Sequence, residues 1–109
     1  MYTEVTSFEE FEKLKSEPAL LAYFSTEACS VCKVLKPKVQ QLLEEEFPKL
    51  KMAYVRSDVL PGVAGQNRIF TAPTILVFFD GHEYIRKSRN IGISELRDAI
   101  ARPYQMMFE

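Results

Sequence analysis

Apolar residues recur at helical spacing in three stretches of the chain, and each stretch predicts a helix. The three helices are expected at about residues 7–17, 30–47 and 94–103. Pro37 lies inside the second stretch, where we expect it to kink the helix. The residues expected on the buried sides are Phe8, Phe11 and Leu14 in the first helix, Val31, Leu35, Val39, Leu42, Leu43 and Phe47 in the second, and Leu96, Ala99 and Ile100 in the third.

Capping and helix-breaking residues set the expected ends of the first and last helices. Ser7 is followed three residues later by Glu10, which is the spacing of a capping box, and Pro18 ends the first pattern. Ser94 is the expected cap of the last helix, and Pro103 is expected to stop it.

Four further stretches read as strands. Residues 19–25 are nearly all apolar or aromatic, which is typical of a strand covered on both faces in a parallel or mixed sheet, and we expect this strand to be the central one. Residues 51–57, 74–79 and about 83–88 are the other three. Asp80-Gly81 predicts a hairpin turn, so the last two strands are expected to be antiparallel.

The remaining segments complete an alternating order of strands and helices. Residues 1–6 are expected to form a short edge strand, and residues 58–70 an irregular turn with a short helix. This order predicts an α/β fold, with a central mixed β-sheet flanked by helices on both faces. The 109 residues are enough for one core, so we expect a single domain over residues 1–109.

The composition and charge of the chain indicate which classes of binding partner to expect. Hydrophobic residues make up 47% of the chain, and 14 basic residues nearly balance 15 acidic ones. This balance provides no broad field of one sign for a nucleic acid. The sequence has no apolar run long enough to span a membrane and no secretory leader pattern at its start. We therefore expect a protein of the cytoplasm that binds neither nucleic acid nor membrane.

Both cysteines of the chain lie in one short motif, Cys29-Ser-Val-Cys32. A C-x-x-C at the junction of a predicted strand and helix is typical of a redox dithiol. The alternative is a pair of small buried hydrophobic residues. A metal centre needs about four cysteine or histidine ligands, and His82, in a distant turn, is the only further candidate. We expect no metal; a cluster shared between two subunits is an alternative that metal analysis tests.

From about residue 7 to residue 102 the chain resembles the thioredoxin family. The resemblance rests on separated signals that occur in the family's order. They are the Cys29-Ser-Val-Cys32 motif, Pro37 in the following helix, Asp58 after the next strand, Thr71-Ala-Pro-Thr74, the Asp80-Gly81 hairpin and Gly92.

The resemblance implies a thiol–disulfide oxidoreductase with a role in cell redox homeostasis. A helix that begins at Cys29 favours its thiolate, so Cys29 is the expected nucleophile and Cys32 the resolving cysteine. Ala72-Pro73, cis in the family, and Gly92 are expected to line the substrate groove; a trans proline at a strand entry is the alternative. The implied substrates are protein disulfides, and the implied electron source is a reductase or a low-molecular-weight thiol. The protein is expected to work as a monomer without a bound cofactor.

The active-site motif departs from the family pattern. Ala28 stands in place of a tryptophan, Ser30-Val31 in place of Gly-Pro, and Tyr23 and Tyr54 in place of a buried aspartate and its lysine. Without a carboxylate to accept a proton from Cys32, reduction is expected to be slow. Tyr23 and Tyr54 are expected to pack as an aromatic pair. These departures leave a second hypothesis open, in which the chain is a binding module of the same fold with little redox turnover.

Overall fold

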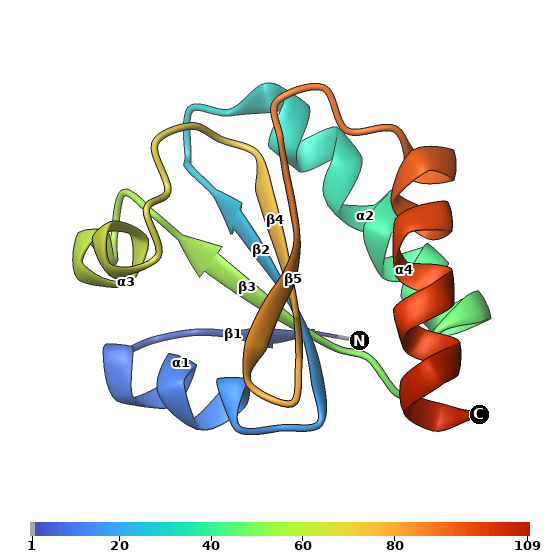
Figure 1. The fold of residues 1–109 in the computed structure, drawn as a ribbon. Helices are drawn as coiled ribbons and strands as arrows, with labels where there is room; N and C mark the ends of the chain where they lie inside the picture. Colours follow the sequence, from blue (N-terminus) through green and yellow to red (C-terminus); the bar gives the residue numbers. More distant parts are fainter. Residues whose placement is uncertain (1) are drawn as a thin grey trace.

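A five-stranded mixed sheet runs through the middle of the protein. The computed structural model describes residues 2–109 (Figure 1). The strand order is β1-β3-β2-β4-β5; β1, β3 and β2 are parallel, and β4 and β5 are antiparallel to their neighbours. The strands are β1 (Thr3–Glu4), β2 (Ala19–Ser25), β3 (Lys51–Arg56), β4 (Thr74–Phe79) and β5 (His82–Ser88). The predicted central position of residues 19–25 is confirmed. Of the edge strand expected at residues 1–6, Met1 lies outside the described residues.

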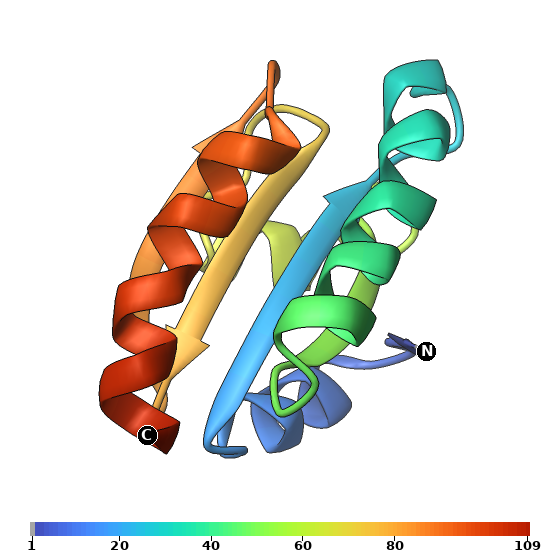
Figure 2. The same ribbon diagram turned by 90° about the vertical axis from the view of Figure 1, so that its right-hand side faces the viewer.

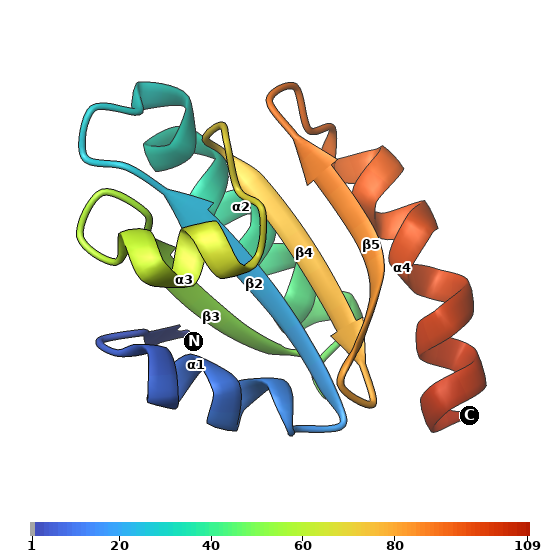
Figure 3. The ribbon, with the colours of Figure 1, turned by 60° about the vertical axis from the view of Figure 1, so that its left-hand side comes forward.

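Four helices cover the two faces of this sheet. They are α1 (Phe8–Lys15), α2 (Ser30–Glu46), α3 (Pro61–Gln66) and α4 (Ile93–Phe108). Figure 2 shows α2 and α4 side by side on one face, and Figure 3 shows α1 and α3 on the other. The predicted α/β class, with helices on both faces of a mixed sheet, is therefore confirmed. No helix among residues 2–109 has the length and apolar character needed to cross a membrane.

The alternation of side chains along β2 divides the core into two clusters. Successive residues of a strand point to opposite faces, and all seven residues of β2 are buried. Leu20, Ala22 and Phe24 pack in the cluster that contains Phe11 of α1. Ala19, Leu21 and Tyr23 pack in the cluster that contains Cys32 of α2. Tyr23 therefore belongs to the face of the sheet that carries the cysteine motif.

The hairpin between β4 and β5 has the predicted turn. Asp80 and Gly81 both adopt positive φ, 54° and 80°. Two residues of this kind form a type I′ turn, whose twist matches that of the two strands. Glycine adopts this conformation without steric cost, and aspartate tolerates it.

Two residues that we predicted to be buried are exposed. Val31 of α2 is 58% exposed, and Phe8 of α1 is 40% exposed. Both lie in the first turn of their helices. Helical spacing identifies which face of a helix is apolar, but it does not show how far along the helix other elements cover that face.

The predicted start and end of the last helix are wrong. Gly92 is the residue before the first turn of α4, no side chain caps it, and the helix continues through Pro103 to Phe108. A proline in a helix removes one backbone donor, but its φ suits the helix. Tyr104 offsets that loss, because its ring lies 5.0 Å from the Phe47 ring and its hydroxyl accepts a hydrogen bond from the Lys49 N–H.

Candidate active site

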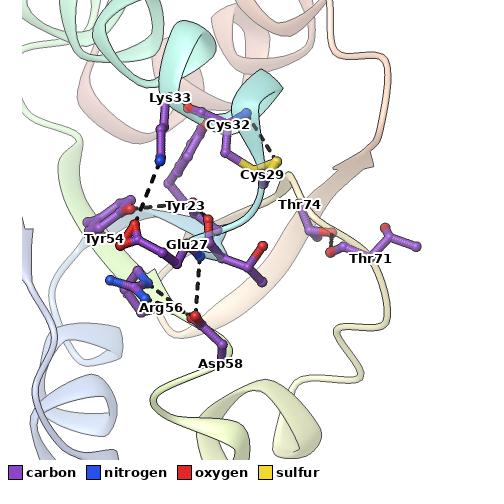
Figure 4. The surroundings of a disulfide bond; sticks show 12 residues. Tyr23, Glu27, Cys29, Cys32, Lys33, Tyr54, Arg56, Asp58, Thr71 and Thr74 are labelled. Atoms are coloured by element: carbon purple, nitrogen blue, oxygen red, sulfur yellow. Dashed lines mark hydrogen bonds and ion pairs between the residues drawn. A yellow bond between two sulfur atoms is a disulfide. The ribbon is translucent and has the colours of Figure 1, made fainter.

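The two cysteines form a disulfide at the N-terminus of α2 (Figure 4). Cys29 is the residue immediately before the helix, and the Cα atoms of Cys29 and Cys32 are 5.3 Å apart. The backbone N–H of Cys32 donates to the Cys29 sulfur, with an N···S distance of 3.1 Å. A helix N-terminus presents N–H groups and positive partial charge, so this position stabilises a thiolate at Cys29.

The two sulfur-bearing residues differ in exposure. Cys32 is 1% exposed and belongs to the core cluster, whereas Cys29 is only partly buried and packs at the edge of that cluster. An incoming thiolate or disulfide therefore has access to Cys29 before Cys32. The structure brings together the two cysteines that the sequence singled out, and it leaves one more exposed than the other.

A carboxylate and an arginine hold the loop that precedes Cys29. The Arg56 guanidinium donates to both oxygens of Asp58 at 3.0 and 2.8 Å, and Asp58 accepts a hydrogen bond from the Glu27 N–H at 3.2 Å. The Arg56 hydrogen bonds hold the pKa of Asp58 well below its usual range, and the Glu27 N–H lowers it further. Asp58 therefore stays ionised near neutral pH, and its charge keeps the loop before the disulfide in place.

Two more loops reach the same end of the molecule as the disulfide. Figure 1 shows the loops that precede α2, β4 and α4 gathered at one end of the sheet. The Ala72–Pro73 peptide bond is cis, and the Pro73 carbonyl accepts a hydrogen bond from the Arg89 N–H at 2.9 Å. This bond ties the proline segment to the segment that leads to Gly92.

Gly92 lines a largely apolar groove of about 590 Å³ between α2 and the loop before α4. Val31 and Val34 form its wall on α2, and Ile91 lies opposite them beside Gly92. Ala72 and Pro73 are not part of this groove. Val34 and Ile91 were not predicted from the sequence as groove residues. Their signal was weak, because an exposed valine in a helix looks like a core residue until the covering elements are known.

Tyr23 and Tyr54 pack as the predicted aromatic pair beneath the disulfide. They are partners in the β2–β3 register, and their rings are stacked with centroids 6.1 Å apart. The Tyr23 hydroxyl also donates a hydrogen bond of 2.6 Å to the Cys32 carbonyl, which the sequence did not predict. Burial raises the pKa of Tyr23 above its usual range, with a smaller contribution from Tyr54. The available signal was the two-residue period of β2, which puts Tyr23 on the face that α2 covers.

The Tyr23 phenol should make the stability of the protein fall in alkali. Above about pH 10 this phenol ionises in the unfolded chain but stays neutral in the fold, because its folded pKa is raised. The free energy of unfolding should therefore decrease by about 1.4 kcal/mol more per pH unit than in Tyr23→Phe, until the folded phenol also ionises. Urea unfolding of both proteins from about pH 9 to pH 11 measures this difference; equal slopes would contradict it.

Metal ligands do not gather at this site. Within residues 2–109, no three histidine, cysteine, aspartate or glutamate side chains lie close enough to hold a metal ion. His82 is exposed at the start of β5.

Comparison with known proteins gives one consistent result. The sequence model of the family named Thioredoxin matches residues 2–102. The chain is 30% identical over 102 residues to the thioredoxin-like protein YdfQ of Bacillus subtilis, which covers 94% of this chain and 88% of that protein. It is 30% identical over 94 residues to a thioredoxin of Rickettsia bellii, covering 86% of each chain.

Solved structures agree with the sequence comparisons. The thioredoxin of Fasciola hepatica superposes with a TM-score of 0.82 at 26% identity, covering 92% of this chain and 97% of that one. A thioredoxin of Thermosipho africanus superposes with a TM-score of 0.74 at 28% identity, covering 83% and 99%. The expected arrangement of sheet and helices is thus the thioredoxin fold.

Proposed function

This chain belongs to the thioredoxin family of thiol–disulfide oxidoreductases, and on that premise we propose that it reduces disulfide bonds in other proteins through Cys29 and Cys32. The proposal includes action in the cytoplasm, as a monomer, in the maintenance of cell redox homeostasis. In a reducing compartment a lone cysteine pair is more useful as a catalytic dithiol than as a structural link.

One observation carries the proposal: a partly exposed sulfur at a helix N-terminus lies directly above a buried one. Cys29 is accessible, and the N–H of Cys32 points at its sulfur. Cys32 is 1% exposed, so a substrate meets Cys29 first. This arrangement supports Cys29 as the nucleophile and Cys32 as the resolving cysteine.

The reaction consists of two thiol–disulfide exchanges. The Cys29 thiolate attacks one sulfur of the substrate disulfide, forms a mixed disulfide and releases the other substrate sulfur as a thiolate. Cys32 then loses its proton to solvent and attacks the Cys29 sulfur, which releases the second substrate thiolate. The substrate gains two electrons, and the dithiol becomes the disulfide. A reductase or a low-molecular-weight thiol returns the two electrons.

The substrate chain is proposed to lie across the loops around the disulfide. Ala72 and Pro73 form one side of this surface, and Gly92 with the apolar groove beside Val31 forms the other. The Arg89–Pro73 hydrogen bond, which joins these two loops, supports their acting as one surface. Because Ala28 provides a much smaller wall than tryptophan, we expect partner choice to differ from that of a general thioredoxin.

A second candidate function is a protein-binding module that uses the same surface with little redox turnover. One feature of the site favours it: Cys32 lies against a neutral tyrosine rather than a carboxylate that could accept its proton. The intact and accessible cysteine pair favours the oxidoreductase.

The reduction potential of the Cys29–Cys32 pair tests the proposal. We would equilibrate the protein in defined thiol buffers and count free thiols by mass spectrometry. A potential near about −270 mV is expected for a reductase, and one near about −180 to −120 mV would indicate oxidation or isomerisation instead. If no intramolecular disulfide forms in any buffer, the dithiol mechanism is wrong and the binding module takes its place.

A further inference from the structure

The buried phenol of Tyr23 makes a hydrogen bond to the backbone of the resolving cysteine. Tyr23 is fully buried on β2, and its hydroxyl donates to the Cys32 carbonyl at 2.6 Å. Figure 4 shows the Tyr23 side chain extending from β2 toward the first turn of α2, to one side of the disulfide. A buried hydroxyl that donates to a helix carbonyl constrains that turn, because breaking the bond leaves a polar group without a partner in the core.

The ring of Tyr23 is itself held in place from its other side. Tyr54 on β3 stacks on it, with the two ring planes 24° apart. The Lys36 ammonium lies 3.8 Å from the Tyr54 centroid and 3.9 Å from the Tyr2 centroid, and donates to the Tyr2 hydroxyl at 2.7 Å. Lys36 lies one helical turn after Cys32 on α2. This helix therefore contacts the tyrosine pair at the start of the turn, through Cys32, and at its end, through Lys36.

Cys32 is consequently held at both of its backbone groups. Its N–H donates a hydrogen bond to the Cys29 sulfur, and its carbonyl accepts one from the Tyr23 hydroxyl. Pro37, further along α2, has no N–H to donate to the Lys33 carbonyl, so the helix has one backbone bond fewer in the turn after Cys32. A hydrogen bond from outside the helix therefore contributes more to holding this turn in place than it would in a helix with all of its backbone hydrogen bonds.

We propose that Tyr23 is a positioning residue for the resolving step: its hydroxyl holds the Cys32 carbonyl so that the Cys32 sulfur is directed at the Cys29 sulfur. This inference rests on the proposed oxidoreductase function, because it concerns the second of the two exchanges. Tyr23 does not touch the substrate. In the first exchange only the Cys29 sulfur attacks; this exchange uses the hydrogen bond from the Cys32 N–H but not the Cys32 carbonyl that Tyr23 holds.

The role is structural and not one of proton transfer. The hydroxyl is a donor to a carbonyl, and burial raises the pKa of Tyr23, so the phenol is neutral when Cys32 ionises. The titratable and charged groups that face the aromatic pair are Cys32 and Lys36 on α2, Tyr2 before β1, whose ring packs against Tyr54, and Arg56 on β3, which interacts electrostatically with Tyr54. Loss of the Tyr23 hydroxyl should therefore lower the rate of the resolving step by the same factor at every pH.

A small disulfide separates the two exchanges. One equivalent of dithiobis(nitrobenzoate) reacts with the reduced protein: Cys29 attacks, and one thionitrobenzoate is released in a first phase. Cys32 then attacks the mixed disulfide and releases a second thionitrobenzoate, so the reagent takes up two electrons and the protein disulfide forms. Stopped-flow absorbance records both phases in one trace, and Cys32→Ser identifies the second phase by removing it.

In Tyr23→Phe the first phase should keep its rate. The second phase should slow by about 2- to 10-fold, which is the change in rate that corresponds to the net free energy of one hydrogen bond. This slowing should be the same from about pH 6 to about pH 9. The matched control is Tyr104→Phe, which removes another buried hydroxyl that contacts one backbone group, far from the disulfide. It should leave both phases unchanged.

Three results would overturn the positioning role. They are an unchanged second phase in Tyr23→Phe, equal slowing of both phases, and a slowing factor that changes with pH. If the wild type itself releases only one thionitrobenzoate, the proposed function fails instead. Should Tyr23→Phe not fold, NMR of the reduced wild type decides: a slowly exchanging Tyr23 hydroxyl proton is expected, and a rapidly exchanging one contradicts the proposal.

Discussion

Replacing Cys29 with serine should abolish disulfide reduction, lowering the turnover rate by at least about a thousandfold. A serine hydroxyl is not ionised near neutral pH and cannot form the mixed disulfide, and the remaining thiol, Cys32, is 1% exposed. The measurement is the rate at which the reduced protein cleaves a protein disulfide with excess low-molecular-weight thiol. This is the largest effect on activity that we expect from a single substitution.

Cys32→Ser is the matched control, because it removes the other sulfur of the same disulfide. This variant should still perform the first exchange and then remain attached to its substrate, so mixed disulfides should accumulate and be visible by mass spectrometry. Activity that survives in Cys29→Ser would contradict the assignment of the nucleophile. Partner binding that persists in Cys29→Ser, in a protein whose wild type shows no turnover, would favour the binding module.

Replacing Phe11 with alanine should lower the free energy of unfolding by about 3–5 kcal/mol. Phe11 is fully buried where α1 meets the sheet, and its ring centroid lies 5.9 Å from that of Phe24 and 6.3 Å from that of Phe78. Truncation leaves a cavity between two strands and a helix, lined by rigid rings that cannot close it. Because a domain of this size has only about 5–15 kcal/mol of stability, urea unfolding should show a large shift.

Phe8→Ala on the same helix is the control for this prediction. Phe8 is 40% exposed, so its removal should lower the free energy of unfolding by only about 1–2 kcal/mol, well below the loss in Phe11→Ala. Phe11→Leu, which keeps most of the volume, should retain the thiol–disulfide chemistry because the α1 cluster lies on the opposite face from the disulfide. Equal losses in Phe8→Ala and Phe11→Ala would contradict the observed packing of α1.

Much of the architecture follows from local sequence pattern. The unbroken apolar run of β2 indicated a strand covered on both faces, and the structure has it between β3 and β4. Asp80-Gly81 indicated a tight hairpin because few residue pairs adopt two positive φ values. The cap at Ser7 also depends only on neighbouring residues: the Ser7 hydroxyl accepts a hydrogen bond from the Glu10 N–H. The Glu10 carboxylate, however, accepts the Thr6 N–H, one residue before the position that a capping box requires.

The incorrect predictions share a cause. Pro103 was expected to end α4 because the cost of a proline in a helix is a local quantity. The helix continues because Tyr104 packs on Phe47, a contact across 57 positions of the chain that no local rule contains. Val31 was assigned to the core because helical spacing does not reveal that its side of the first turn borders a groove.

The sequence by itself determined the order of strands and helices, the family and the cysteine pair, because these depend on spacing, turn chemistry and residue type within short segments. Only the tertiary structure decided which sulfur is accessible, how Pro73 is tied to the loop before Gly92, and that Tyr23 holds the Cys32 carbonyl. The physical reason is the same in each case. Burial and hydrogen bonding at this site arise between separate elements, and their geometry exists only after the helices have packed onto the sheet.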